Sequence, residues 1–278
     1  MAFGDLSRVN TNLQSMGALR QLQSTNNELG MRQLRLATGS RINRAEDDSA
    51  GYTISKKLEA RVRGQAQALS NVGDAKSMLT VAEGGLTTVM DILQTMKEKT
   101  VQAANDTMGV DERAAIKSEL DALATEITDI FGDTTFNGTN LFGGATNTFS
   151  FQVNAESGDT FEVAIITTDA AALSVETGDF DVASSASANA TLTTIDAAID
   201  GISSRLSSLG DSQKRLTFKQ ENLTTSMNNY EAARSRIADA DFAKEQMEIV
   251  KLQILQQTGT AATAQANQGA QSILSLIG

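Results

Sequence analysis

The chain has 278 residues, of which 40 % are hydrophobic and only 4 % aromatic, and it carries a net charge of −11. It contains no proline, cysteine or histidine, so disulfides, histidine metal sites and histidine-activated nucleophiles are excluded. Because proline breaks helix interiors, its absence over this length favours long uninterrupted helices.

The N-terminal segment has the apolar spacing of a helix from Leu6 to Leu29, and Gly39 is a suitable residue to end that helix. A charged connector follows at residues 40–51. We expect its acidic run, Glu46-Asp47-Asp48, to cap the next helix, because carboxylates accept hydrogen bonds from free N–H groups at helix N-termini. The spacing of these oxygens does not match a calcium loop.

Two long segments follow a seven-residue repeat. The second, residues 192–237, keeps it without slip, and one of its two heptad series is apolar at every step. The first is expected to form a helix from about Ser55 to Asp106, with Gly84-Gly85 as a site of close packing or a weak point. A 3.5-residue repeat keeps one seam of a helix facing a partner. Their similar lengths make these segments the natural partners of an antiparallel coiled coil.

The residue pattern changes between the two long helices. A shorter helix is expected after a break at residues 105–111, and alternating apolar residues at 149–153 and 161–165 predict a β-hairpin. Residues 167–190 are rich in Ala, Ser, Thr and Asp and are interpreted as a surface loop. From residue 131 to 200 there are ten acidic residues and no Lys or Arg. This acidic charge discourages nucleic-acid binding.

The C-terminal end has no charged side chain from residue 252 onward, although Met247, Val250 and Ile254 predict a helix. Such an end is unusual for a helix that faces water. No apolar run approaches the roughly 20 residues that span a bilayer. The N-terminus lacks the basic and apolar regions of a cleaved signal, which leaves a cytoplasmic protein or export by a route that reads no such signal.

No motif indicates catalysis. The sequence has no phosphate-binding loop, dinucleotide fingerprint, zinc spacing or catalytic triad, so we predict no catalytic, cofactor-binding or metal-binding residues and no enzyme activity. A signalling coiled coil of the chemoreceptor type is a further alternative, which the missing membrane segment disfavours.

Both ends of the sequence resemble bacterial flagellin. The motifs that carry the resemblance are LATGSRIN at 36–43, DDSAG at 47–51, EGGL at 83–86, FNG at 136–138, RIADADFAKE at 236–245, QILQQTGTA at 253–261 and AQANQ at 264–268. Together they extend over all but the acidic middle. Two long motifs in the same order at opposite ends of a chain are highly specific.

The resemblance implies a mainly α fold: a long antiparallel coiled-coil rod with a small β-hairpin, and a helical end domain formed by both termini. It places the end domain at 1–45 and 237–278, and the rod domain at 46–236 with the hairpin and acidic surface loop at about 131–190. The implied function is a structural subunit that polymerises into the flagellar filament for motility. The hook–filament junction protein, which shares the terminal design, is the alternative.

The resemblance also implies extracellular location in the filament after type III export without signal cleavage. The implied partners are further copies of the chain in a helical homopolymer, an export chaperone, a filament cap protein and a hook–filament junction protein, with no nucleic acid and no membrane. Residues expected at the subunit interface are Leu6, Val9, Leu13, Arg41, Asn43, Asp47, Asp48, Ile254, Leu255, Ile273 and Leu276.

A last expectation concerns host sensing. Flagellins that strongly stimulate the flagellin-sensing Toll-like receptor present an Arg, a Leu four residues later and a Glu on the next helix. The matching positions here are Thr95, Lys99 and Glu119, so only the last one agrees. We therefore expect a weak ligand of that receptor.

Overall fold

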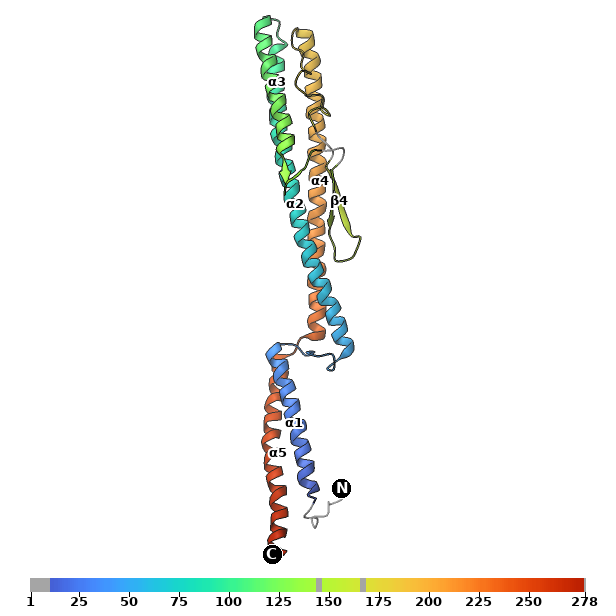
Figure 1. Cartoon of the computed structure of the whole chain (residues 1–278), viewed down its shortest axis with the longest axis vertical. Coiled ribbons are helices and arrows are strands. Elements are labelled where there is room, and N and C mark those ends of the chain that lie inside the picture. Colours follow the sequence, from blue (N-terminus) through green and yellow to red (C-terminus); the bar gives the residue numbers. More distant parts are fainter. Residues whose placement is uncertain (1–10, 144–146, 166–168, 278) are drawn as a thin grey trace. The chain divides into compact units, whose positions relative to one another are not determined.

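The computed structural model describes the backbone of residues 11–143, 147–165 and 169–277, and within these ranges the side chains of all but Asn147 and residues 269–277. The chain is mainly helical, with two small antiparallel hairpins (Figure 1). Its elements in order are α1 (Leu13–Thr38), α2 (Ser49–Ala103), α3 (Val110–Asp133), β1 (Thr135–Phe136), β2 (Thr139–Asn140), β3 (Asn147–Gln152), β4 (Thr160–Ile165), α4 (Ser185–Ala238) and α5 (Phe242–Ile277).

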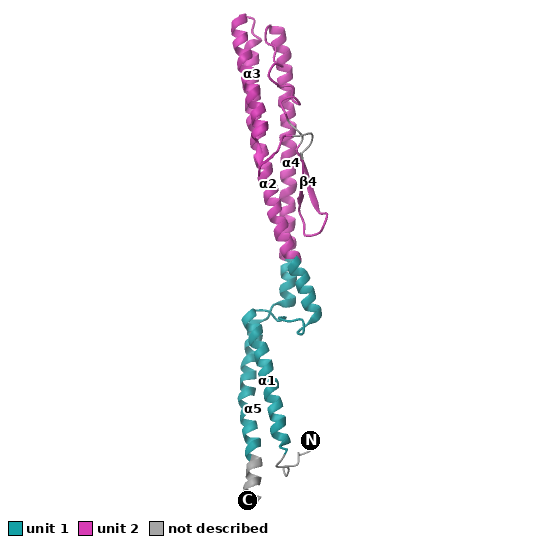
Figure 2. Cartoon of the chain, in the orientation of Figure 1, with its two compact units in different colours: residues 1–60, 229–278 teal, residues 61–228 magenta. Residues whose placement is uncertain are grey.

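The chain divides into two compact units (Figure 2). Unit 1 comprises residues 1–60 and 229–278 and contains α1, α5 and the connectors beside them. Unit 2 comprises residues 61–228 and contains α3, both hairpins and most of α2 and α4. The expected end domain, 1–45 with 237–278, falls within unit 1.

In unit 2 the helices α2 and α4 run antiparallel, as predicted. Residue numbers in the contacts between them rise along α2 and fall along α4. Gln65 Nε2 donates to Ser226 Oγ at 2.9 Å, and Gln213 Nε2 donates to Glu83 Oε2 at 2.7 Å. Further along, Lys97 Nζ lies 2.7 Å from Asp196 Oδ1. One heptad series of each helix is buried in unit 2, including Leu79, Leu86 and Leu93 of α2 and Ile195 and Ile202 of α4.

The glycine pair in α2 marks close packing and no break in the helix. A Cβ atom on Gly85 would lie 2.9 Å from Thr134 Oγ1 and 3.2 Å from the ring of Phe142, whereas one on Gly84 would meet nothing within 4 Å. Only Gly85 is therefore required by its neighbours.

The predicted hairpin is formed by β3 and β4, with Phe149 opposite Val163 and Phe151 opposite Phe161. It packs on the helices of unit 2, since Asn71 Nδ2 donates to the Gln152 carbonyl oxygen at 3.0 Å. The guanidinium carbon of Arg215 lies 4.6 Å from the centre of the Phe161 ring, a favourable cation–π distance. Burial alternates along β4, which is the pattern of a strand with one covered face.

Two helix starts differ from expectation. α2 begins at Ser49 and not near Ser55, because the Asp48 carboxylate accepts the Gly51 N–H at 2.8 Å and caps the helix there. α4 begins at Ser185, inside the expected loop. Its start is fixed by a reciprocal pair: the Ser187 N–H donates to Ser184 Oγ, and the Ser184 N–H donates to Ser187 Oγ.

The segment 169–184 is irregular, but it is more than a surface loop. Five of its apolar side chains are buried in the core of unit 2: Ala170, Leu173, Val175, Phe180 and Val182. Their burial could not be predicted from the sequence, because these apolar residues follow neither a helical nor a strand period. The segment is a packed cover of the helices.

Candidate assembly surface on the terminal helix pair

The helices α1 and α5 of unit 1 lie side by side and antiparallel (Figure 1). Polar contacts join them along their length: Arg32 to Glu245, Gln256 Nε2 to Asn26 Oδ1 at 2.7 Å, Ser15 Oγ to Asn267 Oδ1 at 2.8 Å, and Asn12 Nδ2 to the Ala266 carbonyl oxygen at 2.9 Å. These four contacts fix one register for the two ends of the chain.

The ends of α1 are capped by local residues. Asn12 accepts the Ser15 N–H at 3.0 Å, and Gly39 ends the helix in the left-handed conformation at φ 70°. The cap at Gly39 confirms the predicted end of this helix, since only a residue without a Cβ atom adopts that conformation freely.

The covered faces of the pair are small. Thr25 and Leu29 of α1 are buried together with Ile249 and Leu252 of α5. One turn beyond Leu29 and Ile249, the guanidinium of Arg32 donates from Nη1 to both carboxylate oxygens of Glu245 at 3.0 Å. The Glu245 side chain is only 7 % exposed, and a buried charge depends on such a partner.

The outer faces of the pair are apolar and uncovered in the described part of the chain. Along α5, residues Met247, Val250 and Ile254 are separated by three and four positions. At 100° of rotation per residue they lie opposite the buried Ile249 and Leu252. The large apolar side chains exposed on the two helices are Leu13, Met16, Leu19, Met31 and Leu34 of α1, and Phe242, Met247, Val250, Ile254 and Leu255 of α5.

We name this set of exposed residues, without Phe242, the outer apolar faces. Phe242 follows the spacing of Glu245 and Ile249, and its ring lies beside Gly39 at the end of α1. An exposed apolar surface on a folded chain is a common mark of an interaction site. Here it is combined with an absence of charged side chains from residue 252 onward, so no charge repulsion opposes the approach of a second apolar helix to this part of α5.

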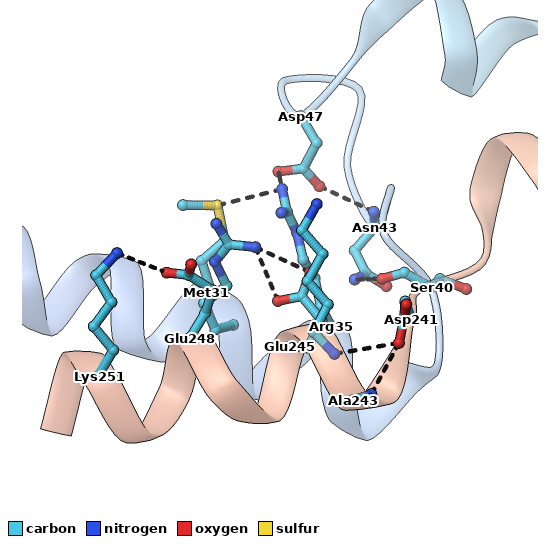
Figure 3. A network of polar contacts seen from close by, with 12 residues as sticks. Met31, Arg35, Ser40, Asn43, Asp47, Asp241, Ala243, Glu245, Glu248 and Lys251 are labelled. Atoms are coloured by element: carbon cyan, nitrogen blue, oxygen red, sulfur yellow. Dashed lines mark hydrogen bonds and ion pairs between the residues drawn. The ribbon is translucent and has the colours of Figure 1, made fainter.

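The connector between α1 and α2 is held by a polar network (Figure 3). Asp47 Oδ2 accepts the N–H groups of Asn43 at 2.9 Å and Arg44 at 3.0 Å, and Arg35 Nη2 lies 3.9 Å from Asp47 Oδ1. The hydrogen bonds from Arg44 and Asn43, followed by the charge of Arg35, hold the pKa of the Asp47 carboxyl below its ordinary value.

The connector also joins the segment that precedes α5. The Arg41 guanidinium donates to the Ile237 carbonyl oxygen at 2.8 Å, and Ser40 forms an antiparallel bridge with Asp239. Beside the network, α1 and the connector enclose a hollow of about 330 Å³ with Met31 and Leu34 in its lining. This hollow continues the outer apolar face of α1.

The residues expected at the subunit interface are placed as follows. Leu13, Ile254 and Leu255 belong to the outer apolar faces, with 64 %, 56 % and 45 % of their surface exposed. Four others, Arg41, Asn43, Asp47 and Asp48, build the connector within the chain. Leu6 and Val9 lie outside the described residues, and so do the side chains of Ile273 and Leu276. Their role between subunits stays a prediction.

Sequence reasoning missed part of the set. The residues it missed are 38–68 % exposed, against 45–64 % for those it selected: Met16, Leu19, Met31, Leu34, Met247 and Val250. Their helical spacing was visible in the sequence. The missing information was which side of each helix the other helix covers.

The three positions assigned to host sensing lie in unit 2. The side chain of Thr95 is exposed, and its hydroxyl donates to the Asp91 carbonyl oxygen of its own helix at 3.0 Å. Lys99 Nζ of α2 lies 2.7 Å from Glu119 Oε1 of α3. The one matching residue is therefore paired with one of the two that differ.

Unit 2 is a helical bundle with its own core, and unit 1 contains a helix pair with exposed apolar side chains. The comparisons give the particular family. The model of the bacterial flagellin N-terminal helical region matches residues 9–147, and that of the bacterial flagellin C-terminal helical region matches residues 192–277. The chain belongs to the bacterial flagellin family, and it is a structural subunit of the flagellar filament, an extracellular assembly.

Similar proteins agree over nearly the whole chain. A flagellin of Halalkalibacterium halodurans is 38 % identical over 97 % of this chain and 99 % of its own length. Flagellin FlaB1 of Treponema pallidum is 36 % identical and a flagellin of Bacillus subtilis 35 % identical, with the same two coverages.

Among solved structures, a Bacillus cereus flagellin matches with 26 % identity and a TM-score of 0.48, covering 59 % of this chain and 94 % of its own. A putative flagellar hook-associated protein from Vibrio parahaemolyticus matches with 18 % identity and a TM-score of 0.58, covering 69 % of this chain and all of its own. This second likeness extends to the fold alone. None of the helices in the described ranges is both long and apolar enough to cross a membrane.

Proposed function

We propose that copies of this chain join in the filament through the outer apolar faces of α1 and α5. The supporting observation is that both helices are apolar on two opposite sides, and each covers only one side of the other. A second copy of the chain supplies an apolar surface of the same kind, and its burial stabilises the contact by roughly 25 cal/mol per Å² removed from water.

The contact is heterologous: the outer face of α5 in one subunit meets a different surface of the next subunit. Heterologous contacts that do not close into a ring produce an open helical polymer. The uncharged end of α5 favours its placement in the interior of that polymer, where an unpaired charge would be costly.

The remaining expectations belong to the same proposal. Residues 1–45 and 237–278 act as the end domain in the filament core, and 46–236 act as the rod domain. The subunit is exported without signal cleavage, assisted by an export chaperone, and it meets a cap protein and a junction protein at the filament ends. It performs no catalysis and requires no cofactor.

The test is assembly of two matched variants. Ile254→Asp places a charge on the outer face of α5, whereas Val110→Asp places one on a more exposed apolar residue, 79 % against 56 %, at the start of α3, where the helix dipole favours it. Seeded polymerisation is followed by sedimentation and electron microscopy, with circular dichroism as the check of folding.

We expect Ile254→Asp to melt as the unmodified monomer does and to form no filaments, while Val110→Asp assembles. Normal filaments from Ile254→Asp would refute the assignment of the outer face of α5. Equal failure of both variants would mean that assembly responds to added charge in general and not to this surface.

A further inference from the structure

Arg205 of α4 is a partly buried cation for which the described residues provide no partner. It forms no hydrogen bond or ion pair with the described residues, and its Nε atom is buried with no acceptor. Burial lowers the pKa of its guanidinium, and the charge of Asp169 only partly offsets this. Buried polar atoms are nearly always paired, so an orphaned guanidinium nitrogen requires an explanation.

Arg205 lies between two hollows in unit 2. The smaller, about 50 Å³, lies beneath β4 and is lined largely by apolar side chains. The larger, about 630 Å³, is formed by one face of α4 and the segment 172–174. The guanidinium leans toward the larger one, since its Nη1 atom is 3.4 Å from the position of a Cβ atom on Gly201, which lines that hollow.

Four hydroxyl-bearing residues line the larger hollow together with Arg205, but they are not equivalent. Thr193 and Thr194 donate their hydroxyl protons to carbonyl oxygens of their own helix. Ser174 and Ser204 form no side-chain hydrogen bond with the described residues. The hydroxyls of Ser174 and Ser204 and the guanidinium of Arg205 therefore remain available to bind a ligand in the larger hollow.

The backbone at Ser174 gives an independent indication. Its φ is 54°, in the left-handed region that favours glycine. The turn has the hydrogen bonds of a helix C-terminus, from the Ser174 N–H to the Ala171 carbonyl and from the Val175 N–H to the Ala170 carbonyl, and glycine is the usual residue at this position. A serine here keeps a hydroxyl beside the hollow at a cost in backbone strain.

We propose that Arg205, Ser174 and Ser204 form a binding site for a small oxyanion of the phosphate or sulfate class. Guanidinium groups bind such oxygens through paired N–H donors, and the two hydroxyls provide further hydrogen bonds. The ligand would connect the segment 169–184 to α4. The Asp169 carboxylate does not occupy the guanidinium, and it accepts the Ala172 N–H at 2.7 Å instead.

The first test compares thermal unfolding of the full chain as a monomer in millimolar sodium phosphate and in sodium chloride of equal ionic strength. We expect phosphate to raise Tm by about 3 °C when it exceeds its Kd tenfold. Arg205→Gln removes this rise. Lys219→Gln removes the same charge from an exposed position of the same helix and retains it.

The second test uses Ser174→Gly, for which the proposal predicts a higher Tm in chloride but a smaller increase of Tm in phosphate. Relief of the left-handed strain raises Tm in chloride, whereas loss of the hydroxyl reduces the increment in phosphate. Hydrogen exchange of residues 169–184 should slow in phosphate for the unmodified chain and for Lys219→Gln, but not for Arg205→Gln. An equal phosphate increment in Arg205→Gln and the unmodified chain, or no increment in either, would overturn the proposal. An equal loss in Lys219→Gln would reduce it to a general charge effect.

Discussion

Unit 2 and the terminal helix pair are built from similar helices, but they use their apolar residues differently. In unit 2, Leu79, Leu86, Leu93, Ile195 and Ile202 are at most 1 % exposed, because three helices, a hairpin and a packed segment surround them. In the terminal pair, Met247, Val250 and Ile254 of α5 remain 45–68 % exposed. The apolar residues of the first region are buried within a single chain. In the second region, many of the apolar residues remain exposed to solvent.

The difference shows that amphipathic pattern and burial are separate properties. A helix with one apolar stripe needs one partner, whereas a helix with two opposite stripes needs partners on both sides. In the terminal pair, α1 and α5 each bury one apolar stripe of the other. In a subunit of a filament, we expect the other sides to be satisfied by neighbouring copies.

The largest expected effect is on hydrogen exchange. Isolated helix pairs with little buried area are marginal in water, so amides of α1 and α5 should exchange in the monomer at least a thousandfold faster than those of α2 and α4 in unit 2. In the filament the two regions should become similarly protected. Equal protection of both regions in the monomer would remove the basis of the comparison.

A pair of core and surface truncations compares the regions directly. Leu86→Ala should reduce the free energy of unfolding by about 3 kcal/mol, because the buried side chain leaves a cavity. Ile254→Ala should change it by less than about 0.5 kcal/mol, as is usual for exposed positions. Urea denaturation of the monomer measures both. A loss for Ile254→Ala comparable to that for Leu86→Ala would mean that α5 is covered in the monomer.

The buried ion pair of the terminal helices should contribute next. Glu245→Gln leaves the Arg32 guanidinium without its carboxylate, which costs roughly 1.5–3 kcal/mol for a charged hydrogen-bonding group. Glu248→Gln is the control, since its contact with Lys251 is 3.5 Å long and largely exposed. We expect exchange in α1 and α5 to accelerate roughly tenfold or more for Glu245→Gln only. Unit 2 should be unaffected by either variant.

Much of this organisation could be predicted from the sequence. The heptad pattern identified the seams of α2 and α4, alternation identified β3 and β4, and Gly39 marked the end of α1. Periodic patterns succeed where one period extends over many residues. The packed segment 169–184 was misjudged because its buried residues, such as Leu173 and Phe180, follow no period.

The candidate assembly surface was only half predictable, for a different reason. The spacing of Met247, Val250 and Ile254 was visible, and so was that of Ile249 and Leu252. Both sets fit one helix, and the sequence does not say which set α1 covers. That choice is made by tertiary contacts such as Arg32 with Glu245, which join residues more than 200 positions apart.

A smaller effect is expected from acid in the connector. The pKa of Asp47 is lowered in the folded chain, so its contribution to stability is complete above the ordinary carboxyl pKa of about 3.9 and is lost as pH falls through the folded value. The amide proton shifts of Asn43 and Arg44 should report this transition by NMR, with a midpoint below pH 3.9. Asp47→Asn should abolish it, and a midpoint above 3.9 would contradict the assignment.

The smallest effect on stability is expected at the positions assigned to host sensing. The Lys99–Glu119 pair bridges α2 and α3 with side chains 34 % and 45 % exposed, so its loss should change the free energy of unfolding by less than about 1 kcal/mol. The double variant Thr95→Arg, Lys99→Leu should therefore keep the fold of unit 2. It also releases Glu119 from its intramolecular partner and supplies the guanidinium that threonine lacks.

The measurement is a reporter assay for the flagellin-sensing Toll-like receptor, with monomers of the unmodified chain, the double variant and Lys99→Leu alone. We expect a weak response from the unmodified chain and the largest gain from the double variant, with a smaller gain from Lys99→Leu because the unpaired Glu119 becomes accessible. A strong response from the unmodified chain, or no gain in the double variant with its melting unchanged, would show that these positions do not control recognition. Either result would leave the contrast between the two regions intact, because both residues lie on the surface of a unit whose core they do not enter.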